Sequence, residues 1–489
     1  ATVAAGTAAS LKAALTDVTA TDALKLKVTG TATVADLLAL DGKTSIPVDA
    51  KSVTAITGTA AEFATLNTAN VDLSSTVALT FTGTIAAADV NAANGLNALA
   101  AQTFGKVTAT VEGSAANLAT NLKTASTDAI TVKVTGTTAT AAELIAIDKV
   151  TSVVVDAKAV KTITADAADV ADVTTVLAAK TIAKAADVAV TIDPADDVTA
   201  LEANSIAKLT TGVVTATVAD ASASYLNSTL KDAKATDALT LKVNGTTATA
   251  ADLNALDAKT KEVITVEATK IEGTLADLNK VFVDVVTSTH FDTTSTNIKN
   301  VNITDKTVTA DAVSKIGVAA GSAVVKATVT ADSAANLVEA LKDATENALT
   351  LTVNGATATA ANLATLNGKT SVDVTVNATE VTGTFNELKA VYVDATKADF
   401  LALGNENIVI DEASTAAADI DKIANATTGK VTATLDAGTV ITDATVTALT
   451  HVNGTTDVIS FTAAANTTAD ATALVALAAK VITADATAF

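Results

Sequence analysis

The sequence of 489 residues contains no cysteine, methionine or tryptophan, and all 32 of its basic residues are lysine. Without cysteine the chain can form no disulfide bond, no zinc–thiolate site and no thiol nucleophile. The 53 acidic residues give a formal net charge of −21. This charge argues against nucleic acid as a partner, because such binding depends on cationic side chains and arginine is the main reader of guanine.

Aromatic residues, prolines and histidines are also scarce. Aromatics make up 2% of the chain, and there are two prolines and two histidines. The longest apolar run, Ala473 to Ala479, is far shorter than the roughly 20 residues that span a bilayer. We therefore predict no transmembrane segment. Much of the 49% hydrophobic content is alanine and valine, which predicts a core of small aliphatic side chains.

What the sequence does contain is internal repetition, with a long period of about 107 residues. The segment Val107-Thr-Ala-Thr-Val111 returns at Val214, Val325 and Val431 with few changes. Glycines that end similar tetrapeptides recur 106 to 110 residues apart, at Gly30, Gly136, Gly245 and Gly355. The boundaries are 1–106, 107–213, 214–324, 325–430 and a partial repeat, 431–489. A repeat of this kind must be considered before any other reading of the fold.

A shorter period of about 26 residues lies inside the long one. Its mark is a Thr, Ser or Asp followed three residues later by an acidic or amide residue and then an apolar one. It occurs at Thr33, Thr59, Ser114, Thr140, Asp166, Thr249, Thr274 and Thr384. This is the capping-box pattern, so each unit is predicted to open a short helix. Alternating runs such as Ala238–Gly245 and Glu262–Thr269 predict strands between the helices.

One helix and one strand in every unit predict a single continuous β-solenoid, similar to a parallel β-helix, over residues 1–489. It would have about 18 coils of about 26 residues, each with a short capped helix. The alternative is four or five separate sandwich domains of about 107 residues. We favour the solenoid because no linker rich in Pro or Gly marks the boundaries of the long repeats.

Few residues suggest chemistry. His290 and His451 lie 161 residues apart in sequence and are interpreted as loop histidines. Calcium is possible at acidic segments, of which Asp193–Asp197 and Asp41-Gly42 are the clearest, but no ligand set is predicted. Sugar cleavage needs paired carboxylates in a cleft that usually has stacking aromatics. Tyr225 and Tyr392 occupy cap or core contexts, so we predict no enzyme and no required cofactor.

Two surface patterns have simple explanations. Threonine alternation could order ice-like water, but it recurs once per long repeat, and strand propensity accounts for most of it. The clearest examples are Thr29, Thr31 and Thr33, with Thr247 and Thr249. Asn-x-Ser/Thr sequons are expected by chance in a chain so rich in threonine. They begin at Asn227, Asn244, Asn302, Asn377, Asn425, Asn453 and Asn466.

Three phrases carry a resemblance: Leu40-Asp-Gly-Lys-Thr-Ser45, Ala55-Ile-Thr-Gly-Thr-Ala-Ala-Glu-Phe63 and Leu403-Gly-Asn-Glu-Asn-Ile-Val-Ile-Asp411. They resemble repeats of giant surface proteins rich in Ala and Thr from bacteria, including cyanobacteria. That group includes S-layer subunits, adhesins and motility-associated coats, many exported by type I secretion. The resemblance implies an extracellular or cell-surface location. The glycine- and aspartate-rich nonapeptides of calcium-binding β-rolls are missing, so it does not imply a calcium requirement.

The functional expectation is a structural protein that assembles with other copies of itself. Stacking of solenoid ends would give a filament, and lateral contact would give an S-layer lattice. Because the net charge is −21, lateral packing should depend on Ca²⁺ or ionic strength. Envelope polysaccharide is a further possible partner. The alternative is the rigid stalk of a giant adhesin, and ice binding is a distant third.

Overall fold

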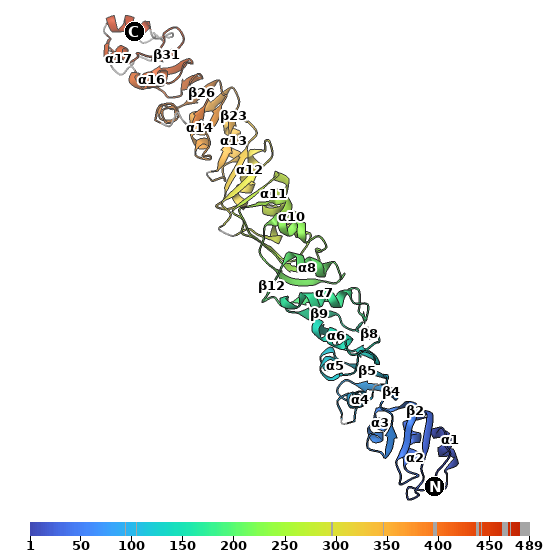
Figure 1. Ribbon diagram of the computed structural model, residues 1–489. Coiled ribbons are helices and arrows are strands. Elements are labelled where there is room, and N and C mark those ends of the chain that lie inside the picture. Colours follow the sequence, from blue (N-terminus) through green and yellow to red (C-terminus); the bar gives the residue numbers. More distant parts are fainter. Residues whose placement is uncertain are drawn as a thin grey trace. The chain divides into compact units, whose positions relative to one another are not determined.

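Strands form where Val, Leu, Ile and Thr alternate, and short helices form where a capping residue precedes an Ala- and Leu-rich run. The computed structural model describes residues 1–92, 94–103, 105–294, 297–345, 347–394, 399–436, 440–441, 443–461, 468–469 and 471–479. Strands and helices alternate along the chain (Figure 1). The chain divides into unit 1 (residues 1–220, 226–241 and 257–262) and unit 2 (residues 221–225, 242–256 and 263–489).

Unit 1 holds two parallel sheets. The first joins, in spatial order, β1 (Lys27–Thr33), β2 (Val48–Thr59), β4 (Ala78–Ala86), β5 (Val107–Gly113), β6 (Ala129–Val134), β8 (Val155–Asp156) and β10 (Ile182–Ala183), with β3 (Val71–Leu73) also paired to β2. The second joins β12 (Asp197–Val198), β13 (Val214–Val218), β11 (Ala189–Ile192), β9 (Thr162–Ala165) and β7 (Thr138–Thr140), with β14 (Ala238–Thr240) paired to β13.

The strands of unit 2 form further sheets, also parallel. Two have three strands each: β15 (Lys242–Val243), β17 (Ile264–Val266) and β19 (Phe291–Asp292); and β23 (Thr352–Val353), β25 (Val374–Val376) and β27 (Phe400–Leu401). Two have five: β16 (Thr247–Thr249), β18 (Lys270–Gly273), β20 (Asn300–Ile303), β21 (Val324–Thr328) and β22 (Ala348–Thr350); and β24 (Thr357–Thr359), β26 (Glu380–Gly383), β28 (Asn407–Ile410), β29 (Val431–Leu435) and β31 (Val458–Phe461). β30 (Val440–Ile441) pairs with β32 (Thr468–Ala469).

The helices are short. They are α1 (Ala8–Ala14), α2 (Val34–Asp41), α3 (Ala60–Leu66), α4 (Leu96–Ala100), α5 (Ala115–Asn121), α6 (Ala141–Asp148), α7 (Val170–Ala178), α8 (Ala200–Ala207), α9 (Ala223–Thr229), α10 (Ala250–Asp257), α11 (Leu275–Phe282), α12 (Ala310–Ala319), α13 (Ala334–Ala340), α14 (Ala360–Asn367), α15 (Phe385–Lys389), α16 (Ala417–Ala424), α17 (Asp443–Thr447) and α18 (Ala471–Ala478). Single turns of other helix types are η1 (Ala167–Asp169), η2 (Ser288–His290) and η3 (Ala390–Asp394).

The prediction of one continuous β-solenoid is wrong. Within the described residues the strands divide among separate parallel sheets of two to eight strands, with helices between them, so the fold is a mixed α/β arrangement. The description of the chain as a β-solenoid repeat protein is corrected in the same way.

The break in the strands explains the error. The run Ala238–Gly245, predicted as one strand, contains β14, which pairs with β13, and β15, which pairs with β17 in a different sheet. Gly245 then adopts a φ of +104°, a conformation that glycine reaches far more easily than other residues. The chain turns there, and β16 begins at Thr247 in a third sheet.

The capping pattern located most helix starts correctly. Seven of the eight predicted capping side chains accept a hydrogen bond from the backbone N–H three residues later; they are Thr33, Thr59, Ser114, Thr140, Thr249, Thr274 and Thr384. The exception is Asp166, which precedes the η1 turn and makes no such bond.

The core consists of small aliphatic side chains, as predicted. In β13 the side chains of Val214, Ala216 and Val218 are buried, while the threonines between them are half-buried. The helices add an apolar stripe, such as Leu253 and Leu256 on α10. Phe63 is the largest fully buried side chain.

Candidate functional site

A buried carboxylate recurs at the same place in successive long repeats. Asp237 follows the turn after α9 and is fully buried. Its Oδ1 accepts a hydrogen bond from the backbone N–H of Val214, at the start of β13, and its Oδ2 accepts one from the N–H of Lys234, both at 2.9 Å. Asp237 itself immediately precedes β14, the neighbour of β13. The side chain therefore fixes the starts of two adjacent parallel strands, and we call this arrangement the carboxylate bracket.

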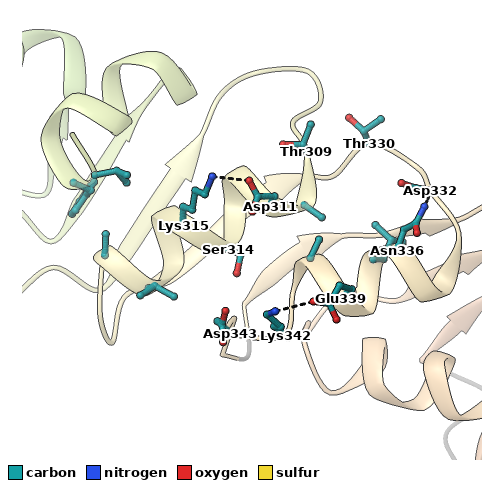
Figure 2. Close-up of a pocket in the computed structure, with 17 residues that line it drawn as sticks. Thr309, Asp311, Ser314, Lys315, Thr330, Asp332, Asn336, Glu339, Lys342 and Asp343 are labelled. Atoms are coloured by element: carbon teal, nitrogen blue, oxygen red, sulfur yellow. Dashed lines mark hydrogen bonds and ion pairs between the residues drawn. The ribbon is translucent and has the colours of Figure 1, made fainter. Parts of the chain in front are cut away.

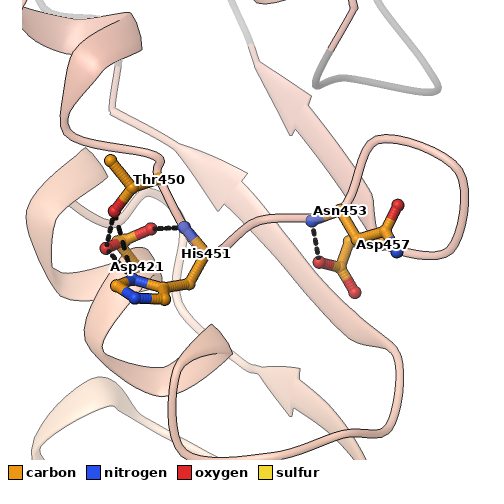
Figure 3. A network of polar contacts seen from close by, with 5 residues as sticks. All are labelled: Asp421, Thr450, His451, Asn453 and Asp457. Carbon is orange, nitrogen blue, oxygen red and sulfur yellow. Dashed lines mark hydrogen bonds and ion pairs between the residues drawn. The ribbon is translucent and has the colours of Figure 1, made fainter.

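The same bracket occurs at two other positions. Asp128 accepts from the N–H groups of Val107 and Ala125, and Asp457 accepts from those of Val431 and Asn453. Figure 3 shows the bond between Asp457 and the Asn453 N–H. At the fourth position, Asn347 accepts from the Val325 N–H at 2.8 Å, and its amide donates to the carbonyl of Thr345. All four side chains are at least 97% buried.

A buried threonine in the following turn supports the brackets of Asp128, Asp237 and Asn347. Thr260 donates to the carbonyl of Leu239 at 2.7 Å and accepts from the N–H groups of Leu239 and Glu262. One hydroxyl thereby satisfies three backbone groups that water cannot reach. Thr151 and Thr370 donate in the same way to Ile130 of β6 and Leu349 of β22, and in the first repeat Thr44 donates to the carbonyl of Leu24, which precedes β1.

A cleft in unit 2 is of a different kind. It has a volume of about 870 Å³ and is lined by residues of α11, α12 and α13 (Figure 2). Both of its lysines are already paired with a nearby acid: Lys315 contacts Asp311 and Lys342 contacts Glu339, each at 2.8 Å. The hydrogen bond and charge of Glu339 raise the pKa of Lys342. Leu337 and Ala340 are among the apolar residues that line the cleft.

The clearest side-chain network joins α16 to the segment after α17 (Figure 3). His451 Nδ1 lies 2.8 Å from Asp421 Oδ2, the His451 N–H donates to Asp421 Oδ1 at 2.6 Å, and the Thr450 hydroxyl donates to Asp421 Oδ2. Burial acts to raise the pKa of Asp421, but the hydrogen bonds from His451 and Thr450 outweigh it, so the pKa lies below its ordinary value.

One buried acid is only half satisfied. Glu406 is 2% exposed, and its Oε2 accepts from the hydroxyl of Tyr392 at 3.1 Å and from the N–H of Gly404 at 2.8 Å. Its Oε1 is buried and has no hydrogen-bond partner within the described structure. Burial, and then the charge of Glu406, raise the pKa of Tyr392 well above its ordinary value.

The predicted candidate residues do not converge on one site. His290 ends the exposed η2 turn, whereas His451 binds Asp421. In the acidic segment, Asp193 accepts from the N–H of Ala195, and Asp197 lies in β12. Asp41 ends α2. Among the described residues no three His, Asp or Glu side chains are grouped so that they could hold a metal ion, and the possibility of calcium stays a prediction.

The two tyrosines and the surface threonines also lie apart. Tyr225 is exposed on α9, while Tyr392 is buried in η3. The register places Lys270 and Glu272 beside Thr247 and Thr249, so charged residues flank this threonine pair. Thr29, Thr31 and Thr33 lie in β1, where Thr33 also caps α2.

The sequons occupy varied positions. Asn227 lies in α9 and Asn302 in β20, Asn425 follows α16, and Asn244, Asn377 and Asn453 lie in turns or irregular segments. Asn466 lies outside the described residues.

Sequence reasoning missed the bracket residues, although a signal was present. Thr-Asp-Ala stands at 127–129 and 236–238, Glu-Asn-Ala at 346–348 and Thr-Asp-Val at 456–458. Thr-Asp-Ala also stands at 21–23, where Asp22 is exposed and forms no bracket. The spacing matches that of the glycines used to find the long period. The signal was overlooked because each bracket side chain binds backbone N–H groups, which every residue type except proline has. One of these N–H groups lies 21 to 26 residues upstream, so no short sequence window contains the interaction.

Comparisons with known protein families, with characterised proteins and with solved structures found no match to the chain. Among the described helices, none has the length and hydropathy that crossing a membrane requires. The functional argument therefore rests on the side chains themselves.

Proposed function

We propose that this chain is a structural, non-enzymatic protein of the bacterial cell surface whose copies assemble with one another. The observation that supports this proposal best is the recurring carboxylate bracket. In a catalytic site a buried carboxylate faces a cleft, whereas Asp128, Asp237 and Asp457 face backbone N–H groups of adjacent strands. Their role is to hold strands in place.

Capping carboxylates lend further support. Glu62, Glu143, Glu202 and Glu387 each complete a capping box by accepting from the N–H of the residue that begins the helix. These acids therefore stabilise local backbone. A chain that uses so many polar groups for its own architecture suits a scaffold role.

The location is supported by the resemblance to Ala- and Thr-rich surface proteins and by composition. A chain without cysteine forms no disulfide, so its folding does not depend on the redox conditions outside the cell. Antibodies against the purified chain should label intact cells of the source organism, and mild protease treatment of those cells should remove the label. Labelling only after the cells are permeabilised would contradict the proposal.

Assembly should depend on cations. A net charge of −21 repels neighbouring copies, and dissolved cations screen that repulsion or bridge carboxylates. Electron microscopy of the purified chain, with a few millimolar Ca²⁺ and without it, should show filaments or sheets when Ca²⁺ is present. A matched sample at the same ionic strength in NaCl separates bridging from screening.

Sedimentation velocity measures the same assembly in solution. Oligomers should grow with protein concentration and with Ca²⁺, and a chelator should reverse the Ca²⁺-dependent part. Monodisperse single chains at high concentration in every buffer would contradict self-assembly.

A further inference from the structure

Unit 1 contains a cavity of about 240 Å³ between α3, α4 and the turn that joins β3 to β4. Six apolar residues line it: Phe63, Leu66, Leu73, Val77, Leu79 and Leu99. The polar residues Asn67, Ser74, Ser75, Gln102 and Thr103 complete the lining. Five of these six apolar side chains are buried, and Leu73 is half-buried. The turn between the strands carries Ser74 and Ser75, whose side chains are too small to close it.

The aromatic part of this wall is particular to the first repeat. Phe63 packs against Phe81 with ring centroids 4.4 Å apart. At the position of Phe63, four residues after the capping residue, later repeats have Val170, Leu278 and Leu388. Phe81 pairs with Gly58, and the matching register positions hold Ile192, Ile303 and Ile410. Aliphatic residues fulfil the structural role elsewhere, so the aromatic pair is not needed for strand packing.

Two of the polar lining residues make hydrogen bonds to neighbouring segments. The hydroxyl of Thr103 donates to the carbonyl of Val77 at 2.7 Å, and the amide of Asn67 binds Asn94. These contacts hold the side chains of Thr103 and Asn67 in position. Gln102 is exposed at the mouth and is the one glutamine in the sequence.

We propose that this cavity binds a small neutral molecule with an apolar body the size of one aromatic ring and one hydrogen-bonding end that meets Gln102. A dry apolar cavity of about 150 Å³ accepts benzene, and drug-sized ligands need about 300 Å³ or more. A volume of about 240 Å³ suits a single ring with a short substituent. No charged side chain lines the cavity in the described structure, so a charged ligand would lose its hydration without compensation.

Binding of benzyl alcohol to the full chain, measured by saturation-transfer NMR, tests this proposal. Two tryptophan variants form a matched pair: Gln102→Trp and Leu209→Trp. Both residues are exposed, and each directly precedes a threonine that donates to the neighbouring strand, Thr103 and Thr210 respectively. Gln102→Trp should cover the mouth and weaken binding at least tenfold, and Leu209→Trp should leave it unchanged.

A second variant fills the space from within. Leu99→Phe adds volume to the wall and should also abolish saturable binding, with circular dichroism used to verify that the fold is kept. If Leu99→Phe does not fold, the comparison of Gln102→Trp with Leu209→Trp still tests whether the cavity binds benzyl alcohol. The proposal is overturned if the wild-type chain shows no saturable binding, or if Gln102→Trp binds benzyl alcohol as well as Leu209→Trp does.

Discussion

At the scale of single residues, the acidic side chains differ in how fully their oxygens are bonded. Both oxygens of Asp237 accept backbone N–H groups, so its burial leaves no unsatisfied polar atom. Glu406 has one bonded oxygen and one without a partner in the described structure. An unsatisfied buried polar atom is costly, so these two buried acids should respond in opposite directions when they are removed.

Replacing Glu406 with valine and Tyr392 with phenylalanine should stabilise unit 2 by about 1–3 kcal/mol. Valine already occupies the matching position at two other places in the chain. The carbonyls of Val77 and Val188 each accept a hydrogen bond from a threonine hydroxyl, as the carbonyl of Glu406 does from Thr427. Urea unfolding of the double variant measures the change. Both variants remove the acceptor of the part-buried Gly404 N–H. Glu406→Val alone is the control, because it also leaves the buried hydroxyl of Tyr392 without its acceptor. A less stable double variant would refute this account.

Replacing Asp237 with alanine should destabilise the protein by about 2–4 kcal/mol, because the N–H groups of Val214 and Lys234 lose their acceptors. Asp237→Asn should cost less. Asn347 shows that an amide oxygen can keep the bond to the strand, although its amide group then needs a carbonyl acceptor. Urea unfolding of both variants provides the comparison, and equal losses would argue against the bracket.

The pair of Asp421 and His451 predicts a pH dependence. The pKa of Asp421 is lowered in the folded chain from an ordinary value of 3.8, so the ionised form is favoured by folding. The stability it contributes is present above about pH 4 and is lost as the pH falls through the lower, folded-state pKa. Thermal unfolding of wild type and Asp421→Asn should therefore differ at neutral pH and converge towards pH 2. A difference that stays constant with pH would contradict this.

At the scale of elements, helix starts were predictable and strand ends were not. A capping residue and its partner lie three residues apart, so one short window of sequence contains the whole interaction, as for Thr140 and Glu143. The division of Ala238–Gly245 between sheets depends on which distant strand each half meets. Alternation of apolar and polar residues is the same for one strand or two, so the sequence pattern could not separate them.

Thr140→Ala should destabilise the chain by about 1 kcal/mol, because the N–H of Glu143 loses its acceptor and the capping box is broken. Asp166→Ala is the matched control, since Asp166 precedes a helical turn but makes no capping hydrogen bond. Its effect should be near zero. Thermal unfolding of the two variants gives the difference, and comparable losses would show that capping is not the cause.

The candidate sites were less predictable than the helices. Tyr392 was expected in a cap or core context and is buried in the core, but its partner Glu406 carries no motif. The cavity beside Phe63 depends on small residues in a turn ten or more positions away, which no local pattern reveals. The bracket residues differ from these sites, because their tripeptides, such as Thr-Asp-Ala, recur with the long period and could have been found from the sequence.

At the scale of the whole molecule, the chain folds as two units, each with its own sheets. Unfolding should therefore not be a single two-state transition. Asp128→Ala removes a bracket in unit 1 and Asp457→Ala removes one in unit 2. Hydrogen exchange measured peptide by peptide should show lost protection mainly in the unit that carries the substitution. Equal losses in both units would mean that the chain unfolds as one.

The bracket also has a consequence for how such a gene can change in length. The strand N–H and the side chain that binds it lie 21 to 26 residues apart, well within one long repeat. Unequal recombination that adds or removes a whole repeat therefore copies or deletes both halves of a bracket together. Copy number can then vary between lineages without separating a buried bracket side chain from the strand N–H that it binds, provided that the breakpoints fall outside these short intervals.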